Sequence, residues 1–183
     1  MKKFILFVFV SLIAASALSQ NQQYVGISLN PEFKDFNSLV LSYGVTYENQ
    51  LSKHSGFEID LNQRRQDQYL TVPIGDGTYQ SSHIKEDYLN LPILYKFYSD
   101  IVNLSTGITF DYFVGWKDIS KFGSIEITGY TVNPKLYIGW AFKVGKTIPL
   151  SNKFYLEPEI QFNPIFKYGY SYYGGAVKLK YKL

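Results

Sequence analysis

The sequence contains no cysteine and only two histidines, and it has no long apolar run beyond its first 20 residues. Without cysteine the chain can form neither a disulfide bond nor a thiolate metal site, and it cannot be anchored as a lipoprotein. The two histidines, His54 and His83, leave few side chains for general-base catalysis or metal binding.

A strong excess of charge is also missing. Once residues 1–19 are set aside as a leader, 16 basic side chains (18 minus Lys2 and Lys3) face 15 acidic ones, which is a net charge of +1. This balance argues against a nucleic-acid partner. Residues 20–183 have the length of one domain, and no linker or sequence repeat divides them.

The first 19 residues have the pattern of a cleaved secretory leader. Lys2 and Lys3 form a positive start, Phe4–Ala15 is apolar, and Ala17 and Ser19 are small residues at the positions that a signal peptidase reads. The alternative is a retained transmembrane helix, but about twelve apolar residues are too few to cross a bilayer, which needs ~20. We therefore predict cleavage after Ser19.

The rest of the chain alternates between apolar and polar residues with the period of two that half-buried strands show. Aromatic residues are frequent in these runs, among 17 tyrosines and 14 phenylalanines. Eight segments follow the pattern: Tyr24–Asn30, Leu39–Asn49, Phe57–Asn62, Leu89–Tyr98, Asn103–Tyr112, Leu136–Gly145, Phe154–Asn163 and Val177–Leu183.

The connections between these segments alternate in length. Three are short, at Gln50–Ser55, Ser99–Val102 and Pro149–Lys153, and four are longer, at Pro31–Ser38, Arg64–Asp87, Gly115–Asn133 and Lys167–Tyr173. Short turns on one side and longer loops on the other, with an even strand count, are typical of bacterial outer-membrane barrels. The sequence predicts an all-β, eight-stranded antiparallel up-and-down transmembrane β-barrel, with both termini in the periplasm.

A secreted soluble barrel or sandwich is the alternative, with the apolar face inside. The aromatic residues decide between the two, because an eight-stranded interior has little room for large side chains. Twelve of them share the apolar face: Tyr43, Tyr47, Phe57, Tyr95, Phe97, Phe110, Tyr112, Trp140, Phe142, Phe154, Phe162 and Tyr181. We expect them to face lipid, some of them in aromatic girdles.

The opposite face then lines the lumen and contains all the charged residues of the alternating segments. These are Glu48, Glu58, Asp60, Lys96, Asp111, Lys143, Glu157, Glu159, Lys178, Lys180 and Lys182. Buried charges must be paired, and eight strands leave little open cross-section, so we predict a lumen closed by ion pairs. A narrow channel for small solutes is the alternative. Pro92 and Pro158 lie within predicted strands and should interrupt pairing or form bulges there.

One segment resembles a known family. Tyr88–Tyr98 (YLNLPILYKFY) is similar to the Y-L-x-[IL]-P-[IL]-L-x-K strand of PorT-type outer-membrane β-barrel proteins of Gram-negative bacteria, and Gly107 and Gly174–Leu179 are compatible with that pattern. The resemblance implies a small barrel and, from the family's best-known member, a role in assembling a protein-secretion machine. The chain departs from many outer-membrane barrels by ending in Leu183 rather than an aromatic residue.

Enzymatic activity is a further alternative, since some outer-membrane lipid hydrolases and acyltransferases use a serine with a histidine and an acid. His54 lies beside Ser55 in a short turn, and His83 follows Ser81 and Ser82 near Glu86 and Asp87. Such pairs are also ordinary turn chemistry. Because proximity in a loop does not establish a catalytic geometry, we predict a non-enzymatic protein without a cofactor. We expect no metal site either, since no pair of His, Asp or Glu residues has ligand spacing and Gly75–Asp76–Gly77 lacks the acids of a calcium loop.

The external loops are the expected site of partner binding. Gln68–Val72 and Thr78–Ser82 flank Pro73–Gly77 and predict a hairpin beyond the membrane, and Ile125–Thr131 predicts a second. Exposed strand edges there can recruit a partner by β-addition, or the hairpins only extend the barrel wall. The expected partners are outer-membrane lipid and envelope or secretion proteins.

Overall fold

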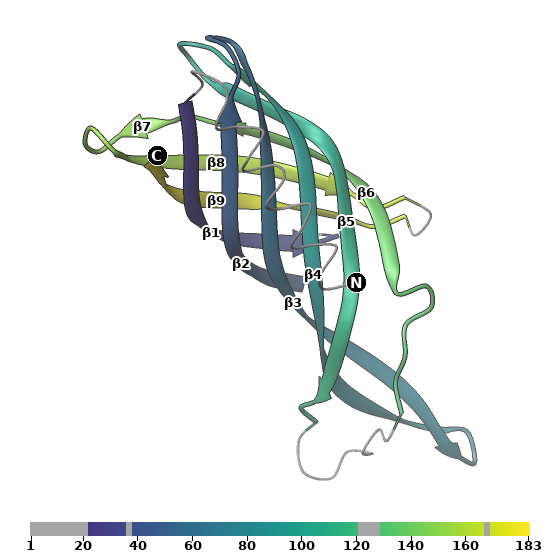
Figure 1. Ribbon diagram of the computed structural model, residues 1–183. Coiled ribbons are helices and arrows are strands. Elements are labelled where there is room, and N and C mark those ends of the chain that lie inside the picture. The colour runs from purple at the N-terminus through teal and green to yellow at the C-terminus, as the bar shows by residue number, and fades with distance from the viewer. Residues whose placement is uncertain (1–21, 36–37, 121–128, 167–168) are drawn as a thin grey trace, which may run out of the picture.

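The computed structural model describes residues 22–35, 38–120, 129–166 and 169–183. The predicted leader, residues 1–19, and most of the predicted second hairpin lie outside these ranges. Within them the chain forms strands and turns (Figure 1). No helix in this part of the chain has the length and hydropathy that crossing a bilayer requires.

Nine strands follow one another along the chain. They are β1 (Gln22–Lys34), β2 (Ser38–Gln50), β3 (Ser55–Gly75), β4 (Thr78–Tyr98), β5 (Asn103–Asp118), β6 (Leu136–Gly145), β7 (Ile148–Pro149), β8 (Phe154–Pro164) and β9 (Ser171–Lys182). Each strand from β1 to β5 pairs antiparallel with the next, β9 pairs with both β1 and β8, and β8 also pairs with β6 and with the short β7. The eight long strands therefore close into a ring, which confirms the predicted eight-stranded antiparallel barrel.

The two ends of the barrel differ. At one end, here called the terminal end, β1 begins, β9 ends and the chain makes its short turns. In each of these turns a serine hydroxyl accepts a hydrogen bond from the backbone N–H three residues later. The acceptors are Ser52, Ser99 and Ser151, and the donors are the N–H groups of Ser55, Val102 and Phe154 respectively. Serine hydroxyls close turns in this way.

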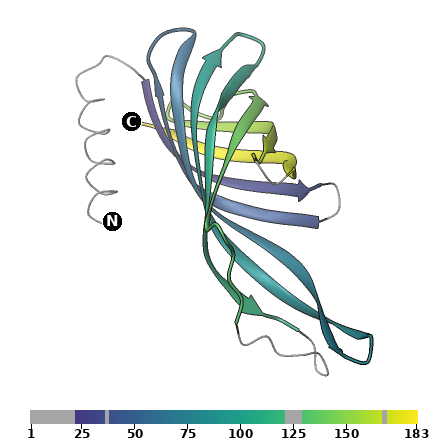
Figure 2. The same cartoon turned by 90° about the vertical axis from the view of Figure 1, so that its right-hand side faces the viewer.

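At the other end, the hairpin end, β3 and β4 continue well beyond the other strands (Figures 1 and 2). Residues 64–87, predicted as a long connection, therefore continue the two strands as a hairpin. This confirms the hairpin predicted from Gln68–Val72 and Thr78–Ser82. Its tip contains Asp76 and Gly77, both at positive φ, which a tight two-residue hairpin turn needs. Pairing of β3 with β2 ends at Arg65, and pairing of β4 with β5 begins at Ile84, so the outer part of the hairpin has two unpaired edges among the described residues.

The two prolines predicted to disturb strand pairing, Pro92 and Pro158, leave the register of their strands unchanged. Opposite Pro92, the ladder between β3 and β4 lacks pairs between Ile59↔Ile93 and Asn62↔Asn90. Pro158 lies just beyond the last pair of β6 with β8, so its missing N–H removes no bond from that seam. Pro31 was expected to begin a loop, but it lies within β1, opposite Leu41 of β2.

Side chains on the two faces of the ring have opposite chemistry. Large apolar side chains point outward and are exposed to solvent or lipid, with Ile27 and Leu39 each 62% exposed. Charged and polar side chains point into the lumen, where Lys96, Lys178 and Lys180 have no exposed surface. In a soluble protein the arrangement is the reverse. The faces follow the predicted alternation, and the outer one has the composition that faces lipid in transmembrane barrels.

Candidate functional site: the charged lumen

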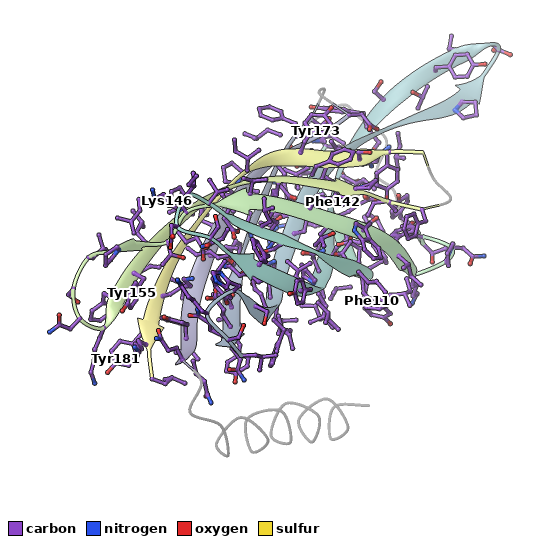
Figure 3. The ribbon with its side chains drawn as sticks, turned by 90° about the horizontal axis from the view of Figure 1, so that it is seen from above. Phe110, Phe142, Lys146, Tyr155, Tyr173 and Tyr181 are labelled. Carbon is purple, nitrogen blue, oxygen red and sulfur yellow. The ribbon has the colours of Figure 1, made fainter. Side chains whose placement is uncertain are left out.

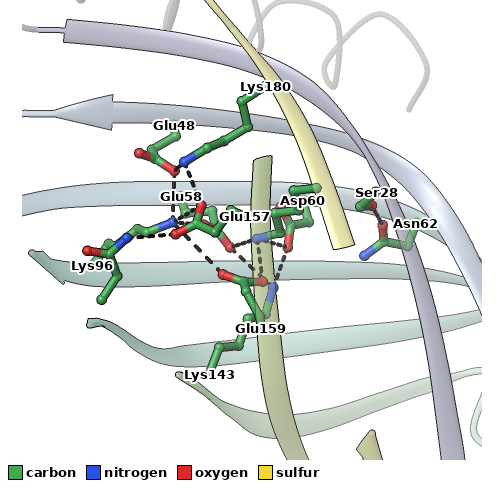
Figure 4. A network of polar contacts seen from close by, with 12 residues as sticks. Ser28, Glu48, Glu58, Asp60, Asn62, Lys96, Lys143, Glu157, Glu159 and Lys180 are labelled. Atoms are coloured by element: carbon green, nitrogen blue, oxygen red, sulfur yellow. Dashed lines mark hydrogen bonds and ion pairs between the residues drawn. The ribbon is translucent and has the colours of Figure 1, made fainter. Parts of the chain in front are cut away.

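Nine charged side chains meet in the half of the lumen nearest the terminal end. We call them the lysine–carboxylate cluster: Glu48, Glu58, Asp60, Lys96, Lys143, Glu157, Glu159, Lys178 and Lys180. Inward positions on six strands supply them, so that residues far apart in the sequence are brought together (Figure 4). Five carboxylates face four ammonium groups, which gives the cluster a formal charge of −1.

Lys96 lies at the centre of this cluster. Its Nζ donates hydrogen bonds to carboxylate oxygens of Glu48, Glu58 and Glu157, each at 2.8 Å. Carboxylate oxygens of these three glutamates lie within 4.8 Å of one another, a spacing that could suit a metal ion. The ammonium group already supplies the positive charge that such an arrangement needs, so the geometry is that of a satisfied ion-pair network.

The other three lysines of the cluster link the remaining carboxylates. Lys180 contacts Glu157 at 2.5 Å and Glu48 at 2.8 Å. Lys143 contacts Asp60 at 2.5 Å, and Lys178 contacts Glu58 and also Glu159, the latter at 3.0 Å. Lys143 also contacts Glu58, at 3.2 Å, so each lysine bridges at least two acids. Each lysine has at least one of these contacts to a strand that is not its neighbour in the ring.

A second group of charges lies further toward the hairpin end, and we call it the arginine cluster. The guanidinium of Arg64 donates two hydrogen bonds to Glu32, both at 3.1 Å, and one to Asp111 at 2.7 Å. Its planar face lies against the ring of Tyr172, 4.1 Å from the centroid. Asn90 links this cluster to the middle of the lumen, because its amide donates to Asp111 at 2.9 Å and accepts from Asn62.

Beyond the arginine cluster the lumen is filled by apolar and aromatic side chains, the hydrophobic cap: Val40, Tyr88, Phe113, Tyr137, Ile165 and Tyr172. Glu86 lies among these rings and accepts hydrogen bonds from Gln66, Tyr88 and Tyr130. Burial and this carboxylate raise the pKa of the Tyr130 hydroxyl, so Tyr130 remains a neutral donor. Two charged layers and one aromatic layer thus occupy the described lumen.

The barrel is similar to solved structures, although its sequence matches no known family. No family model matches the sequence, and no curated protein matches it either. The outer membrane protein OprG from Pseudomonas aeruginosa has a similar structure, with a TM-score of 0.53 over 90% of this chain and 97% of that one, at 10% sequence identity. Such low identity shows a shared fold alone.

Two further solved structures were found at lower similarity. Neisserial surface protein A has a TM-score of 0.49 at 10% identity, covering 90% of this chain and 98% of that one. Ail, the attachment invasion locus protein of Yersinia pestis, has a TM-score of 0.48 at 12% identity, covering 89% of this chain and 97% of that one.

The structure places ten of the eleven charged residues predicted for the lumen inside the ring, where they are buried. Asp111 belongs to the arginine cluster rather than to the larger network. The eleventh, Lys182, lies at the end of β9, is half-buried and has no ion pair among the described residues. Sequence reasoning missed Glu32 and Arg64, because both were assigned to loops.

The two histidines take part in local contacts. His54 donates from Nδ1 to the carbonyl of Tyr98 and stacks on Phe97, so it closes a turn at the terminal end. His83 stacks on Tyr69 with 4.3 Å between ring centroids, and its Nε2 lies 3.5 Å from Asp67, with no hydrogen-bond partner among the described residues. The acids expected near His83 are engaged elsewhere, since Asp87 pairs with Arg65 and Glu86 binds the cap.

Proposed function

We propose that this chain is a non-enzymatic outer-membrane β-barrel with a structural or protein-interaction role, and that its lumen is closed by charge pairs. The observation that supports this most directly is the inverted distribution of side chains. Lysines with no exposed surface fill the interior, whereas isoleucine and leucine cover the outside. Lipid is the environment in which this arrangement is stable, and the predicted leader directs such a chain across the inner membrane.

The terminal end faces the periplasm in this proposal. Short turns are typical of the periplasmic side of bacterial barrels, and longer connections of the external side. The turns after β2, β4 and β6 are short, whereas the β3–β4 hairpin extends far beyond the barrel at the other end (Figure 2). The hairpin end therefore lies outside the cell.

A closed lumen predicts the absence of ion conduction. The refolded barrel, residues 20–183, should produce no discrete current steps in a planar bilayer, since Lys96 binds three carboxylates across the lumen. A variant with Lys96→Ser and Glu157→Ser shortens two of the side chains that close it, and provides the positive control. Discrete steps from the unaltered protein would favour the small-solute channel and reject the plug.

The β3–β4 hairpin is the interaction element in this proposal. Its outer part presents unpaired strand edges among the described residues, and Tyr69 and Tyr79 are 67% and 70% exposed. Strand edges can take up an extended segment of a partner through backbone hydrogen bonds. The resemblance to PorT-type proteins supports an envelope or secretion protein as that partner.

Photo-crosslinking in intact envelopes tests the interaction role. A crosslinking residue at Thr71, on the part of β3 that pairs with β4 but not with β2, should capture a specific envelope protein, and the same residue at Ile160, on the outer face of β8, should not. Identical products from both positions, or none from Thr71, would leave the hairpin as a simple extension of the barrel wall.

A further inference from the structure

The outer surface near the terminal end has an apolar groove of about 460 Å³. β-Branched side chains, Val25, Ile27 and Val45, line it together with larger residues on neighbouring strands, among them Tyr47, Phe154 and Tyr181. The strand register explains the shape, because Val25 of β1 lies between Tyr47 of β2 and Tyr181 of β9. Two aromatic rings thus border a gap that a valine cannot fill.

The tyrosine on one side of this gap has an unsatisfied hydroxyl. Tyr47 is only 8% exposed, and its hydroxyl is buried without a hydrogen-bond partner among the described residues. A buried tyrosine hydroxyl normally has a partner, because leaving it unpaired is unfavourable. Because Tyr47 is among the residues that line the groove, an ester or phosphate oxygen of a bound molecule would supply the missing acceptor.

Positive charge surrounds the same end of the barrel. Among the described residues, the turns and strand ends there contain Lys53, Lys146, Lys153 and Lys182 but one acidic side chain, Asp100. Lys153 is held close to the groove, because its Nζ donates to the Tyr181 hydroxyl at 3.1 Å and lies 5.4 Å from that ring's centroid. Figure 3 shows Tyr155, Tyr181 and Lys146 at this end, away from Phe110 and Tyr173.

We propose that this groove binds a phospholipid with an anionic headgroup. An acyl chain lies over Ile27 and Val45, the Tyr47 hydroxyl donates to an ester or phosphate oxygen, and Lys153 contacts the headgroup phosphate. The inference rests on the proposed membrane location. A lipid fits better than a protein partner, because the groove is continuous with the apolar outer surface and tyrosine and lysine lie at its end, as they do at membrane interfaces.

Native mass spectrometry of the refolded barrel tests the site. The detergent-solubilised protein, residues 20–183, is mixed with equal amounts of phosphatidylglycerol and phosphatidylcholine. We expect one retained phosphatidylglycerol, favoured about fivefold over phosphatidylcholine, which is the size of the effect of one lysine near an anionic headgroup. Lys153→Gln should abolish the preference, whereas Lys53→Gln, on a turn that does not line the groove, should retain it.

A second pair of variants tests the groove itself. Val25→Trp fills the gap between Tyr47 and Tyr181 and should reduce retention of both lipids, and Leu39→Trp, an outward substitution at the other end of β2, should not. Tyr47→Phe should weaken retention of both lipids without changing the preference between them. Heat-dependent mobility in electrophoresis confirms that each variant is folded.

The outcomes separate this inference from the proposed function. A protein that remains folded and monomeric without detergent overturns the membrane location and the lipid site together. A detergent-dependent barrel with equal retention of both lipids, or equal effects of Lys153→Gln and Lys53→Gln, overturns the lipid site alone. A dimer that Val25→Trp dissociates would assign the groove to a second copy instead.

Discussion

Lys96 of β4 and Glu157 of β8 form an ion pair at 2.8 Å across the lumen, although their strands are not neighbours in the ring. Neither side chain has exposed surface. Removing one partner of such a pair leaves a buried charge without compensation, which is far more costly than losing a surface ion pair. The pair therefore allows direct tests of what closes and stabilises the barrel.

Lys96→Met should destabilise the barrel strongly. The substitution keeps much of the side-chain volume but leaves Glu48, Glu58 and Glu157 without their shared ammonium group, and the expected loss is about 3–5 kcal/mol. Urea unfolding in lipid vesicles, followed by tryptophan fluorescence, measures it. Lys182→Met is the control, because Lys182 is half-buried and has no ion pair among the described residues, and its unfolding midpoint should hardly change.

Glu157→Leu should also destabilise the barrel, and its effect should not add to that of Lys96→Met. The two residues share an ion pair, so the double variant should differ from the sum of the single variants by about 0.5–3 kcal/mol. The same unfolding measurement on all four proteins gives this coupling energy. Simple additivity would show that the two charges act independently and would contradict a common network.

The alternation predicted the eight strands and most of the lumen charges, because apolar and polar residues must separate wherever one face meets lipid. It failed at Arg64 because the strand continues beyond the apolar outer surface. There the outward side chains, such as Gln63 and Arg65, are polar as well, so the period of two is no longer visible in the hydropathy. Glu32 was missed because Pro31 was interpreted as the start of a loop. In the structure Pro31 stays in β1, paired with β2.

Contacts across the lumen were beyond sequence reasoning for a different reason. Strand order and face predict which residues enter the lumen, but the tilt and stagger of a closed barrel determine which of them meet. Lys96 illustrates this, because it contacts acids on β2, β3 and β8. Strand order alone suggests that Glu157 and Glu159 pair with lysines of the two neighbouring strands. The structure confirms this for Lys180 with Glu157 and for Lys178 with Glu159, whereas Lys143 pairs with Glu58 and Asp60 on β3.

Arg64→Lys should destabilise the barrel even though it keeps the charge. The guanidinium binds Glu32 and Asp111 together and lies flat against Tyr172, a geometry that an ammonium group cannot reproduce. We expect a loss of about 1–3 kcal/mol, the cost of leaving buried acceptors unsatisfied. The adjacent Arg65→Lys is a close control, since Arg65 is exposed and, within the described part of the chain, forms an ion pair with Asp87 alone. Equal unfolding midpoints for the two variants would contradict the role of the planar group.

Gly44→Ala tests how closely the strands approach one another inside the barrel. A Cβ atom at Gly44 would lie 2.1 Å from the carbonyl oxygen of Leu61 on β3, so the backbone itself would have to move. We expect a loss of about 1–3 kcal/mol, as for other overpacked interiors. Gly115→Ala is the matched control, because a Cβ there meets nothing within 4 Å. The fraction of folded barrel after refolding into vesicles, read from electrophoretic mobility, should fall for Gly44→Ala and stay unchanged for Gly115→Ala. If both variants refold equally, β2 and β3 can move apart at Gly44 without loss of stability. The narrow, side-chain-filled lumen would then not be required for folding.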